Sequence, residues 1–377
     1  MNLIFELFVD VVLLHWVIVS IFTIAGVAGY LLYKPTKKGG EYKDTEIVFV
    51  TKASRSVEGV LFDSIRHNAT FLKSYTFKIV VDEGCELYSK LNLFIKEFKN
   101  VELVVVPVSF KCAAIAKGRA IEYFIRNHVV ETKWYSFIDD DNHIMDKKFL
   151  QEISYYSKNG YEAANGILYP RLGRSKLAFV ADAIRYFDDI TIFRIGTGLL
   201  KTPLNGFHGE LLIAHGKILK SVNFNRETIT EDFAFSRELI KNNVKVWQSE
   251  TMVSIQSPHS VADFIKQRNR WYRGISSDIK SASWKMKIFS GLRIIDWKIG
   301  ILGSWVVFPI WFTFPIPIYI SLFCTIGLVY YYTAYITGAM MINSPMCMFE
   351  IPFYGVMETV SPHLRVKNKL NFNVIEK

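Results

Sequence analysis

Residues 134–144 read WYSFIDDDNHI, an aromatic and apolar run that ends in three consecutive carboxylates. Such a run is easily buried as a strand, but three like charges side by side are costly unless a cation lies among them. Acidic residues also follow strands in ordinary polar turns, so this stretch alone leaves both interpretations open. Other motifs in the sequence are needed to distinguish these two interpretations.

Four short runs have the composition of buried strands. They are EIVFVT (46–51), FKIVVD (77–82), VELVVVPV (101–108) and WYSFID (134–139). Segments of helical character separate them, at residues 56–72, 86–98 and 113–128. Strands that are apolar throughout and alternate with helices indicate a parallel sheet covered on both faces. The sequence therefore predicts one α/β domain with a mostly parallel sheet over residues 34–275.

Polar residues stand where the predicted strands end, which is where ligands bind in parallel sheets. Thr51 follows the first strand, Asp82 ends the second, and Asp139 opens the acidic triplet. The connecting loops contain neither GxGxxG nor GxxxxGK[ST], so dinucleotide and P-loop sites lose their main support. Carboxylates hold a diphosphate only through a divalent cation, for which oxygen ligands favour Mg²⁺ or Mn²⁺. In an extended chain, Asp139 and Asp141 would face this cation and Asp140 would face away.

A second acidic motif lies in the stretch ETITEDFAFSRELIKNNVKVW (227–247). Thr230 is placed to be the N-cap of a helix, with Glu231 and Asp232 at the positive end of its dipole. In the alternative interpretation, Asp232 points into the site and takes the proton from a hydroxyl nucleophile.

A basic and aromatic motif lies in DFIKQRNRWYRG (263–274). It can be explained as a basic helix at a membrane surface. Alternatively, Gln267 and Arg270 bind phosphate oxygens, while Trp271 forms a flat wall for a sugar ring. A departing diphosphate needs positive charge beyond the metal, which favours this second interpretation.

The hydrophobic residues, half of the 377, are concentrated towards the two ends of the chain. Residues 7–33 form a nearly uncharged run of roughly 20 or more positions, which is enough to cross a bilayer once. Residues 299–342 are long enough for two spans of about 20 residues each, with the turn between them near Pro315 and Pro317. Residues 347–360 contain two glutamates and are expected to be interfacial or re-entrant.

Basic clusters flank these spans, and the net charge of the chain is +10. Such clusters place their flanks on the cytoplasmic side and near anionic lipid. No nucleic-acid-binding motif accompanies the charge, so membrane lipids and not nucleic acid are the expected partners. Four widely separated cysteines fit a reducing compartment and give no Cys-based zinc site.

The order of motifs resembles that of the membrane-integrated family 2 glycosyltransferases, inverting GT-A enzymes that include cellulose and hyaluronan synthases. The motifs are DDD (139–141), TED (230–232) and QRNRW (267–271), followed by apolar segments. Further stretches are similar to the egghead-type β-1,4-mannosyltransferases, namely AKGRAIEYF (116–124), NGFHGE (205–210), TITEDFAFS (228–236) and EIPFYGVMETV (350–360).

This resemblance implies roles for individual residues. Asp232 would be the catalytic base, and Asp139 with Asp141 would bind the metal. The donor nucleotide and its diphosphate would contact Thr51, Asp82, Lys117, Asp139, Gln267, Arg270 and Trp271, with help from Arg119. The acceptor would contact His208, Glu231 and Trp271.

The resemblance also implies a function and a layout. The expected function is hexose transfer from GDP-mannose or a UDP-sugar to a lipid-linked or glycolipid acceptor, with Mn²⁺ or Mg²⁺, on the cytoplasmic face of a membrane. A processive polysaccharide synthase is the main alternative, although three spans are few for a secretion channel. A metal-dependent phosphohydrolase or a non-catalytic membrane scaffold would have no use for all three motifs. The expected segments are an anchor (1–33), the GT-A domain (34–275), an amphipathic interface helix (276–298), two spans (299–342) and an interfacial segment with a cytoplasmic tail (343–377).

Overall fold

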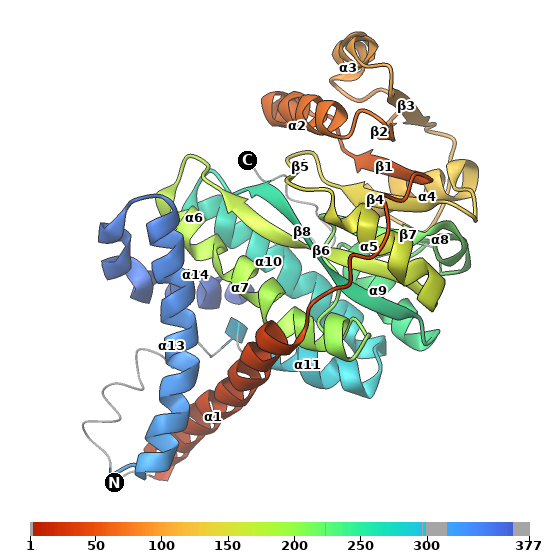
Figure 1. Cartoon of the computed structure of the whole chain (residues 1–377). Helices are drawn as coiled ribbons and strands as arrows, with labels where there is room; N and C mark the ends of the chain where they lie inside the picture. The colour runs from red at the N-terminus through yellow and green to blue at the C-terminus, as the bar shows by residue number, and fades with distance from the viewer. Residues whose placement is uncertain (1–2, 223, 296, 299–314, 365–377) are drawn as a thin grey trace.

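A computed structural model describes residues 3–222, 224–295, 297–298 and 315–364. Its centre is an eight-stranded sheet in the order β3-β2-β1-β4-β7-β6-β8-β5 (Figure 1). The strands are β1 Thr45–Val50, β2 Thr76–Asp82, β3 Val101–Val106, β4 Trp134–Ile138, β5 His143–Ile144, β6 Tyr161–Arg171, β7 Leu212–His215 and β8 Lys245–Gln256. Strands β3, β2, β1 and β4 pair in parallel, as do β6 and β8, while β7 and β5 run antiparallel to their neighbours. The predicted α/β class with a mostly parallel sheet is confirmed.

Helices cover both faces of the sheet, as the fully apolar strands require. In β1, Ile47 and Phe49 face one hydrophobic core, and Val48 and Val50 face another. Helices α2, α3 and α5 contribute to the first core, and α4, α8 and α9 to the second. These helices are α2 Glu58–Phe71, α3 Tyr88–Phe94, α4 Ala116–His128, α5 Lys148–Tyr156, α8 Gly216–Val222 and α9 Glu231–Lys241.

The remaining helices form a second layer around the far end of the sheet (Figure 1). They are α1 Leu3–Leu32, α6 Lys176–Asp182, α7 Ile184–Ile190, α10 Val261–Asp278, α11 Trp284–Ile295, α13 Ile318–Met341 and α14 Ile351–Val360. The predicted interface segment 276–298 is not one helix, because its first residues complete α10 and a short 3₁₀ turn precedes α11. A π-helical turn, Arg194–Leu199, lies against α1.

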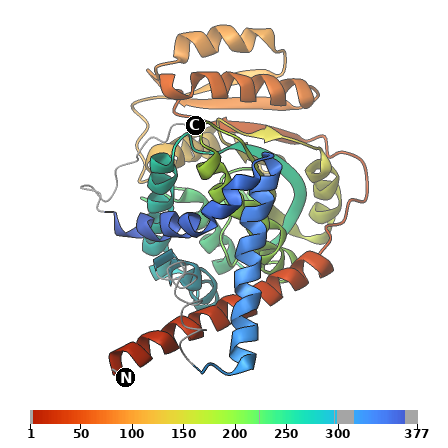
Figure 2. The ribbon, with the colours of Figure 1, turned by 90° about the vertical axis from the view of Figure 1, so that its left-hand side faces the viewer.

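Helices α1 and α13 cross and pack together, although they stand near opposite ends of the chain (Figure 2). Trp16 of α1 is buried against Cys324 and Leu328 of α13, and the backbone N–H of Gly327 donates to Ser20 Oγ at 3.0 Å. By length and composition, residues Glu6–Leu32 and Ile318–Met341 could each cross a membrane. The other predicted span of the 299–342 block falls largely on residues 299–314, outside the described residues.

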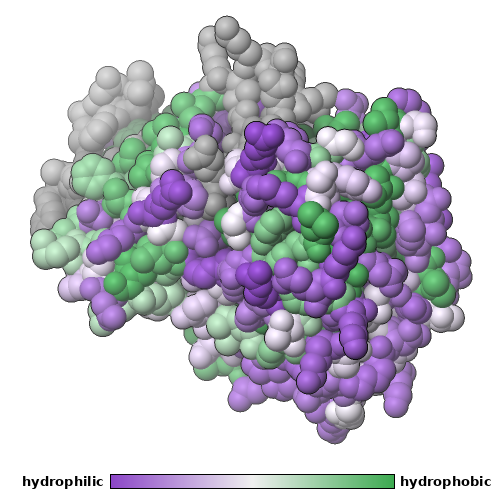
Figure 3. All heavy atoms as spheres, turned by 90° about the horizontal axis from the view of Figure 1, so that it is seen from above, coloured by the Kyte–Doolittle hydropathy of each residue, from purple (hydrophilic) through white to green (hydrophobic). Residues whose placement is uncertain are grey.

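The predicted interfacial segment, residues 347–360, packs on the protein as a 3₁₀ turn followed by α14. Tyr354 and Met357 of this segment share a hydrophobic core with Phe179 of α6, Phe264 of α10 and Tyr335 of α13. Hydrophilic residues predominate on the face of the molecule seen from above, with smaller apolar areas between them (Figure 3).

Candidate functional site

A cavity of about 430 Å³ lies at the carboxyl ends of β1, β2 and β4, beside the first turn of α9 and one side of α10. This is a usual volume for a small-molecule site. All of the residues predicted for the site line it except Arg119 and Asp141: Thr51, Asp82, Lys117, Asp139, His208, Glu231, Asp232, Gln267, Arg270 and Trp271. Residues separated by more than 200 positions in the sequence therefore meet in one place.

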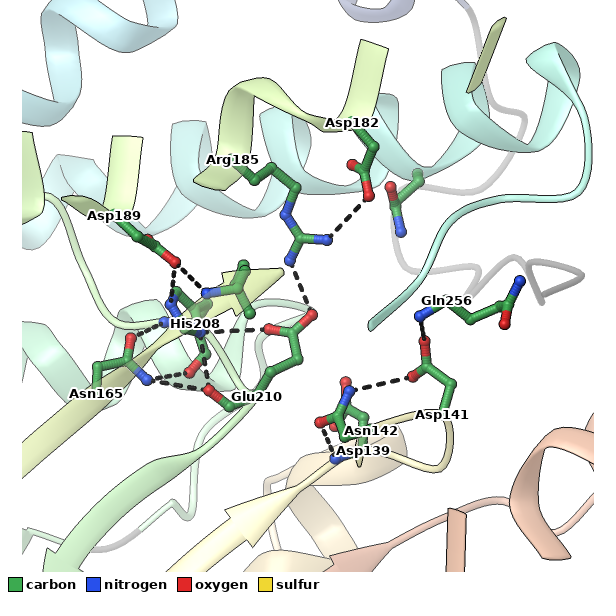
Figure 4. Close-up of polar contacts among 12 residues, drawn as sticks. Asp139, Asp141, Asn142, Asn165, Asp182, Arg185, Asp189, His208, Glu210 and Gln256 are labelled. Atoms are coloured by element: carbon green, nitrogen blue, oxygen red, sulfur yellow. Dashed lines mark hydrogen bonds and ion pairs between the residues drawn. The ribbon is translucent and has the colours of Figure 1, made fainter. Parts of the chain in front are cut away.

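Asp141 departs from its prediction because of the local backbone. Strand β4 ends at Ile138, and the chain turns at Asp140 and Asp141, so the alternation expected of an extended chain does not hold. Asn142 stabilises this turn, because its Oδ1 accepts from the Asp139 backbone N–H at 2.8 Å. Asp140 therefore joins Asp139 at the cavity wall, while Asp141 is buried and accepts from the Gln256 backbone N–H at 2.9 Å (Figure 4). The predicted orientations of Asp140 and Asp141 were wrong.

Lys117 lies at the centre of the acidic residues in the cavity. Its ammonium group pairs with Asp139 and lies 3.6 Å from Glu231 Oε1. Burial alone would lower the pKa of Lys117, but the charges of Asp139 and Glu231 outweigh it and raise the pKa. This cation makes the close approach of several carboxylates tolerable.

Asp232 stands in the first turn of α9 and faces the same cavity. Burial, followed by the neighbouring charge of Glu231, raises the pKa of Asp232 to about 7, against the opposing effect of Lys117. Thr230 occupies the predicted N-cap position, but its hydroxyl makes no capping hydrogen bond and instead donates to Asp278 Oδ2 at 3.0 Å. The start of α9 is thereby tied to the end of α10.

Hydrogen bonds also hold the acidic residues at the carboxyl ends of β2 and β4. Arg119 of α4 donates to Asp82 and to the backbone oxygen of Pro107, the latter at 2.7 Å. Thr51 donates to Asp140 Oδ2 at 3.0 Å. These bonds fix two carboxylates at the rim where the parallel strands end.

Helix α10 contributes the opposite wall. Trp271 contacts two guanidinium groups, with the central carbon of Arg185 4.7 Å and that of Arg268 4.6 Å from its ring centre. Arg268 is itself almost fully buried and bonds Asp182 at 2.9 Å and Glu358 of α14 at 2.8 Å. Stacking and ion pairing together hold the indole in one orientation.

A buried polar network forms the floor (Figure 4). His208 Nε2 lies 3.2 Å from Asp189 Oδ2, and His208 Nδ1 donates to the backbone oxygen of Glu210 at 2.9 Å. Arg185 bonds Glu210 Oε1 at 2.8 Å and also pairs with Asp182. Burial would lower the pKa of His208, but the charge of Asp189 outweighs it and raises the pKa.

Sequence reasoning missed Arg185, Asp189 and Glu210 as site residues. Arg185 and Asp189 belong to IRYFDDI (184–190), where charged residues interrupt an otherwise apolar helix, and Glu210 closes NGFHGE. Charged residues among aromatic residues could have indicated these positions. Such residues are buried only when they have partners, so they point to a buried polar network.

The sequence of the chain is similar to those of known glycosyltransferases. The glycosyl transferase family group 2 pattern matches residues 134–342. The chain is 22% identical over 268 residues to the β-1,4-mannosyltransferase egh of Drosophila melanogaster, covering 68% of this chain and 57% of that protein. It is 24% identical over 260 residues to the β-1,4-mannosyltransferase bre-3 of Caenorhabditis elegans, covering 65% of this chain and 55% of that protein. The match thus spans little more than half the length of these relatives.

A solved structure shares the fold. The mannosyltransferase PcManGT from Pyrobaculum calidifontis, in complex with GDP-Man and Mn²⁺, superposes with a TM-score of 0.52 at 13% identity, covering 92% of this chain and 99% of that chain. The predicted GT-A fold is confirmed by this likeness. Since the family pattern also extends over more than half of the sequence, the chain belongs to glycosyl transferase family group 2.

Proposed function

We propose that the chain is a membrane-bound glycosyltransferase that transfers one hexose, with inversion, from a nucleotide-diphospho-sugar to a lipid-linked or glycolipid acceptor. The observation that carries the proposal is the single cavity in which Asp139, Asp232 and Arg270 meet. An acidic strand end, a carboxylate with its pKa near neutrality and a basic helix are what this reaction requires.

The donor is assigned to the strand-end side of the cavity. Asp82 and Thr51 would contact the nucleoside, while Lys117, Gln267 and Arg270 would bind the diphosphate and balance the charge of the leaving group. GDP-mannose is the favoured donor, because the relatives are named mannosyltransferases and the mannosyltransferase of similar fold was solved in complex with GDP-Man. UDP-sugars remain the alternative to be tested beside it.

A divalent cation, Mn²⁺ or Mg²⁺, fits the residues present. Among the residues that the structure describes, no group of three or more His, Cys, Asp or Glu side chains could hold a metal ion by itself. Asp139 and Asp140, both on the cavity wall, supply the one or two carboxylates that such a cation needs when substrate phosphates complete its coordination. The cation would neutralise charge on the departing diphosphate.

In the proposed reaction, ionised Asp232 accepts the proton of the acceptor hydroxyl. The hydroxyl oxygen forms the new bond to the anomeric carbon, while the bond from that carbon to the diphosphate breaks and its electron pair leaves with the nucleoside diphosphate. His208, Glu231 and Trp271 would orient the acceptor, with the indole as a flat surface for its sugar ring.

The basic flanks of the apolar helices support placing the catalytic domain on the cytoplasmic side. We also propose the order of segments expected from the sequence: anchor, catalytic domain, interface helix, membrane spans and tail. The interface helix is α11 alone, and not the whole of residues 276–298. Processive synthesis is the competing function. Product length distinguishes the two, because a single-transfer enzyme adds one sugar and stops.

The first test is donor turnover by the purified full chain in detergent with Mn²⁺, a lipid extract and a panel of GDP- and UDP-sugars. We expect lipid-dependent release of one nucleoside diphosphate, reduced about 10²–10⁴-fold in Asp232→Asn, because the base is lost. Glu227→Gln, an equivalent change at an exposed residue, should retain full turnover. Equal turnover by Asp232→Asn and the parent chain would exclude Asp232 as the base.

A further inference from the structure

The face of α10 that lines the cavity continues beyond it towards α9. Gln267 and Trp271 line the cavity. Gly274 and Asp278 follow Trp271 at intervals of three and four residues, so they lie on the same face of the helix. A Cβ atom at Gly274 would lie 2.4 Å from Thr230 Cγ2 and 2.5 Å from Thr230 Oγ1. Helix α10 therefore packs directly against the residue that precedes α9.

Asp278 joins the two helices through a single carboxylate oxygen. Its Oδ2 accepts from Thr228 Oγ1 at 2.7 Å and from Thr230 Oγ1 at 3.0 Å. Its Oδ1 lies 3.9 Å from a guanidinium nitrogen of Arg237 in α9. The side chain of Asp278 is only 12% exposed, so these contacts are largely shielded from water.

The bond to Asp278 determines what Thr230 does at the start of α9. A threonine at an N-cap position ordinarily accepts from the N–H of the second or third helical residue. The third helical residue is Phe233, and its N–H donates instead to Asp232 Oδ1 at 2.8 Å. A hydroxyl can donate and accept at once, but the rotamer of Thr230 that reaches Asp278 makes no capping bond. The N–H that a cap would take thus binds the carboxylate proposed as the base.

The bond from Phe233 favours the ionised form of Asp232. Burial and then the charge of Glu231 raise the pKa of Asp232, whereas Lys117 and the Phe233 N–H lower it. The charged groups that face Asp232 come from Glu231 of the same helix, Lys117 of α4 and Glu210 of the loop before β7. All of these charges remain in the variants below, so a change in titration reports the hydrogen bond.

We propose that Asp278 is a positioning residue for the base. By binding the hydroxyl of Thr230, it keeps that hydroxyl from capping α9 and leaves the Phe233 N–H to hold the Asp232 carboxylate. The inference rests on the proposed transferase function, in which Asp232 takes the acceptor proton, and it adds the residue that prepares Asp232 for this step.

The first test follows the Phe233 amide in the full chain in detergent, with ¹⁵N only in the phenylalanines and the signal assigned by Phe233→Leu. Because this N–H is bonded to Asp232, its nitrogen chemical shift should titrate with the carboxylate, with a midpoint at about pH 7. In Asp278→Ala the hydroxyl of Thr230 is released to cap the helix, and the titration should be largely lost. Asp278→Asn keeps an oxygen that accepts from both threonines and should titrate like the parent chain.

The pH dependence of donor turnover is the second readout. Losing one hydrogen bond to a charged group corresponds to about one pKa unit, so the acidic limb of kcat/KM in Asp278→Ala should move up by about one pH unit. Turnover at about pH 6 should then fall about tenfold. The donor KM should keep its parental value, because the nucleoside side of the cavity is unchanged. Asp278→Asn should retain the parental limb.

Thr230→Val, added to Asp278→Ala, is the discriminating variant. Valine has nearly the shape of threonine and keeps the contact with Gly274, but it has no hydroxyl with which to cap α9. If Asp278 acts by withholding that hydroxyl, the double variant should recover the parental titration of the Phe233 amide and the parental acidic limb. If Asp278 only stabilises the fold, the second substitution should add to the damage. A double variant that behaves like Asp278→Ala alone would overturn the inference.

The two proposals can fail separately, because the amide titration needs no substrate. A chain that shows the expected titrations but turns over none of the donors tested would retain the effect of Asp278 on Asp232 and contradict the transferase function. Turnover by a chain whose Phe233 amide is indifferent to Asp278→Ala would remove the positioning role and leave the transferase function standing.

Discussion

The adjacent carboxylates Glu231 and Asp232 face one cavity with a single lysine between them and Asp139. Burial and then the charge of Glu231 raise the pKa of Asp232 to about 7, so the carboxyl is largely protonated in mildly acidic solution. Because only the ionised form accepts a proton, we expect kcat/KM to fall about tenfold per pH unit below 7 and to level off above it. A pH profile of donor turnover measures this.

Glu231→Gln tests the cause of that profile. Removing the neighbouring charge should lower the pKa of Asp232, so the acidic limb should move to lower pH even if turnover itself decreases. The position of the limb, rather than the rate, is the readout. An acidic limb that stays in place would mean that another group controls it.

Single residues also show where sequence reasoning succeeds and fails. Asp139 could be assigned to the site because ligands bind where parallel strands end, whereas Asp232 was assigned to it through the family resemblance. Asp141 was misplaced because Asn142 folds the chain back at the end of β4, which cancels the alternation of an extended strand. Arg185 was missed because its partners, Asp182 and Glu210, are recognisable only in three dimensions.

At the scale of elements, the contact between α6 and α13 depends on Gly338. A Cβ atom at this position would lie 2.7 Å from Ala183 Cβ and 3.3 Å from the backbone of Val180. We expect Gly338→Ala to lower the free energy of unfolding by about 1–3 kcal/mol through overpacking. Thermal unfolding in one detergent measures the effect.

Gly291→Ala in α11 is the matched control for that substitution. The nearest atom to its added Cβ would be Ile279 Cδ1 at 4.0 Å, so the methyl group has room. Alanine is better than glycine inside a helix by about 1 kcal/mol, and the variant should be slightly stabilised. Equal stabilisation by both substitutions would show that α6 and α13 are not in close contact.

The elements themselves differ in how well the sequence predicts them. Strands β1 to β4 were predicted within a few residues, because each is a short apolar run bounded by polar residues. The docking of α14 was not predicted, since it depends on Arg268 meeting Glu358 across 90 residues of sequence. Its local pattern, apolar with two glutamates, equally fits a segment at a lipid surface.

At the scale of the whole molecule, the proposed orientation places the sheet domain on the cytoplasmic side. Cys85 and Cys112 are partly exposed on this domain, whereas Cys324 and Cys347 are buried. We expect a membrane-impermeant maleimide to label Cys85→Ser chains in inside-out vesicles and to leave sealed right-side-out vesicles unlabelled. Labelling only in right-side-out vesicles would reverse the topology, and a Cys85→Ser, Cys112→Ser chain is the control for background.

The crossing of α1 with α13 has a consequence for how the enzyme is made. Synthesis delivers α1 first, and its packing partner follows only after the whole intervening domain has emerged. During that interval the sheet can close around its own two cores, since neither core draws on α13. The sheet domain can therefore fold before α13 has been synthesised, and the contact between α1 and α13 forms only after the sheet is in place.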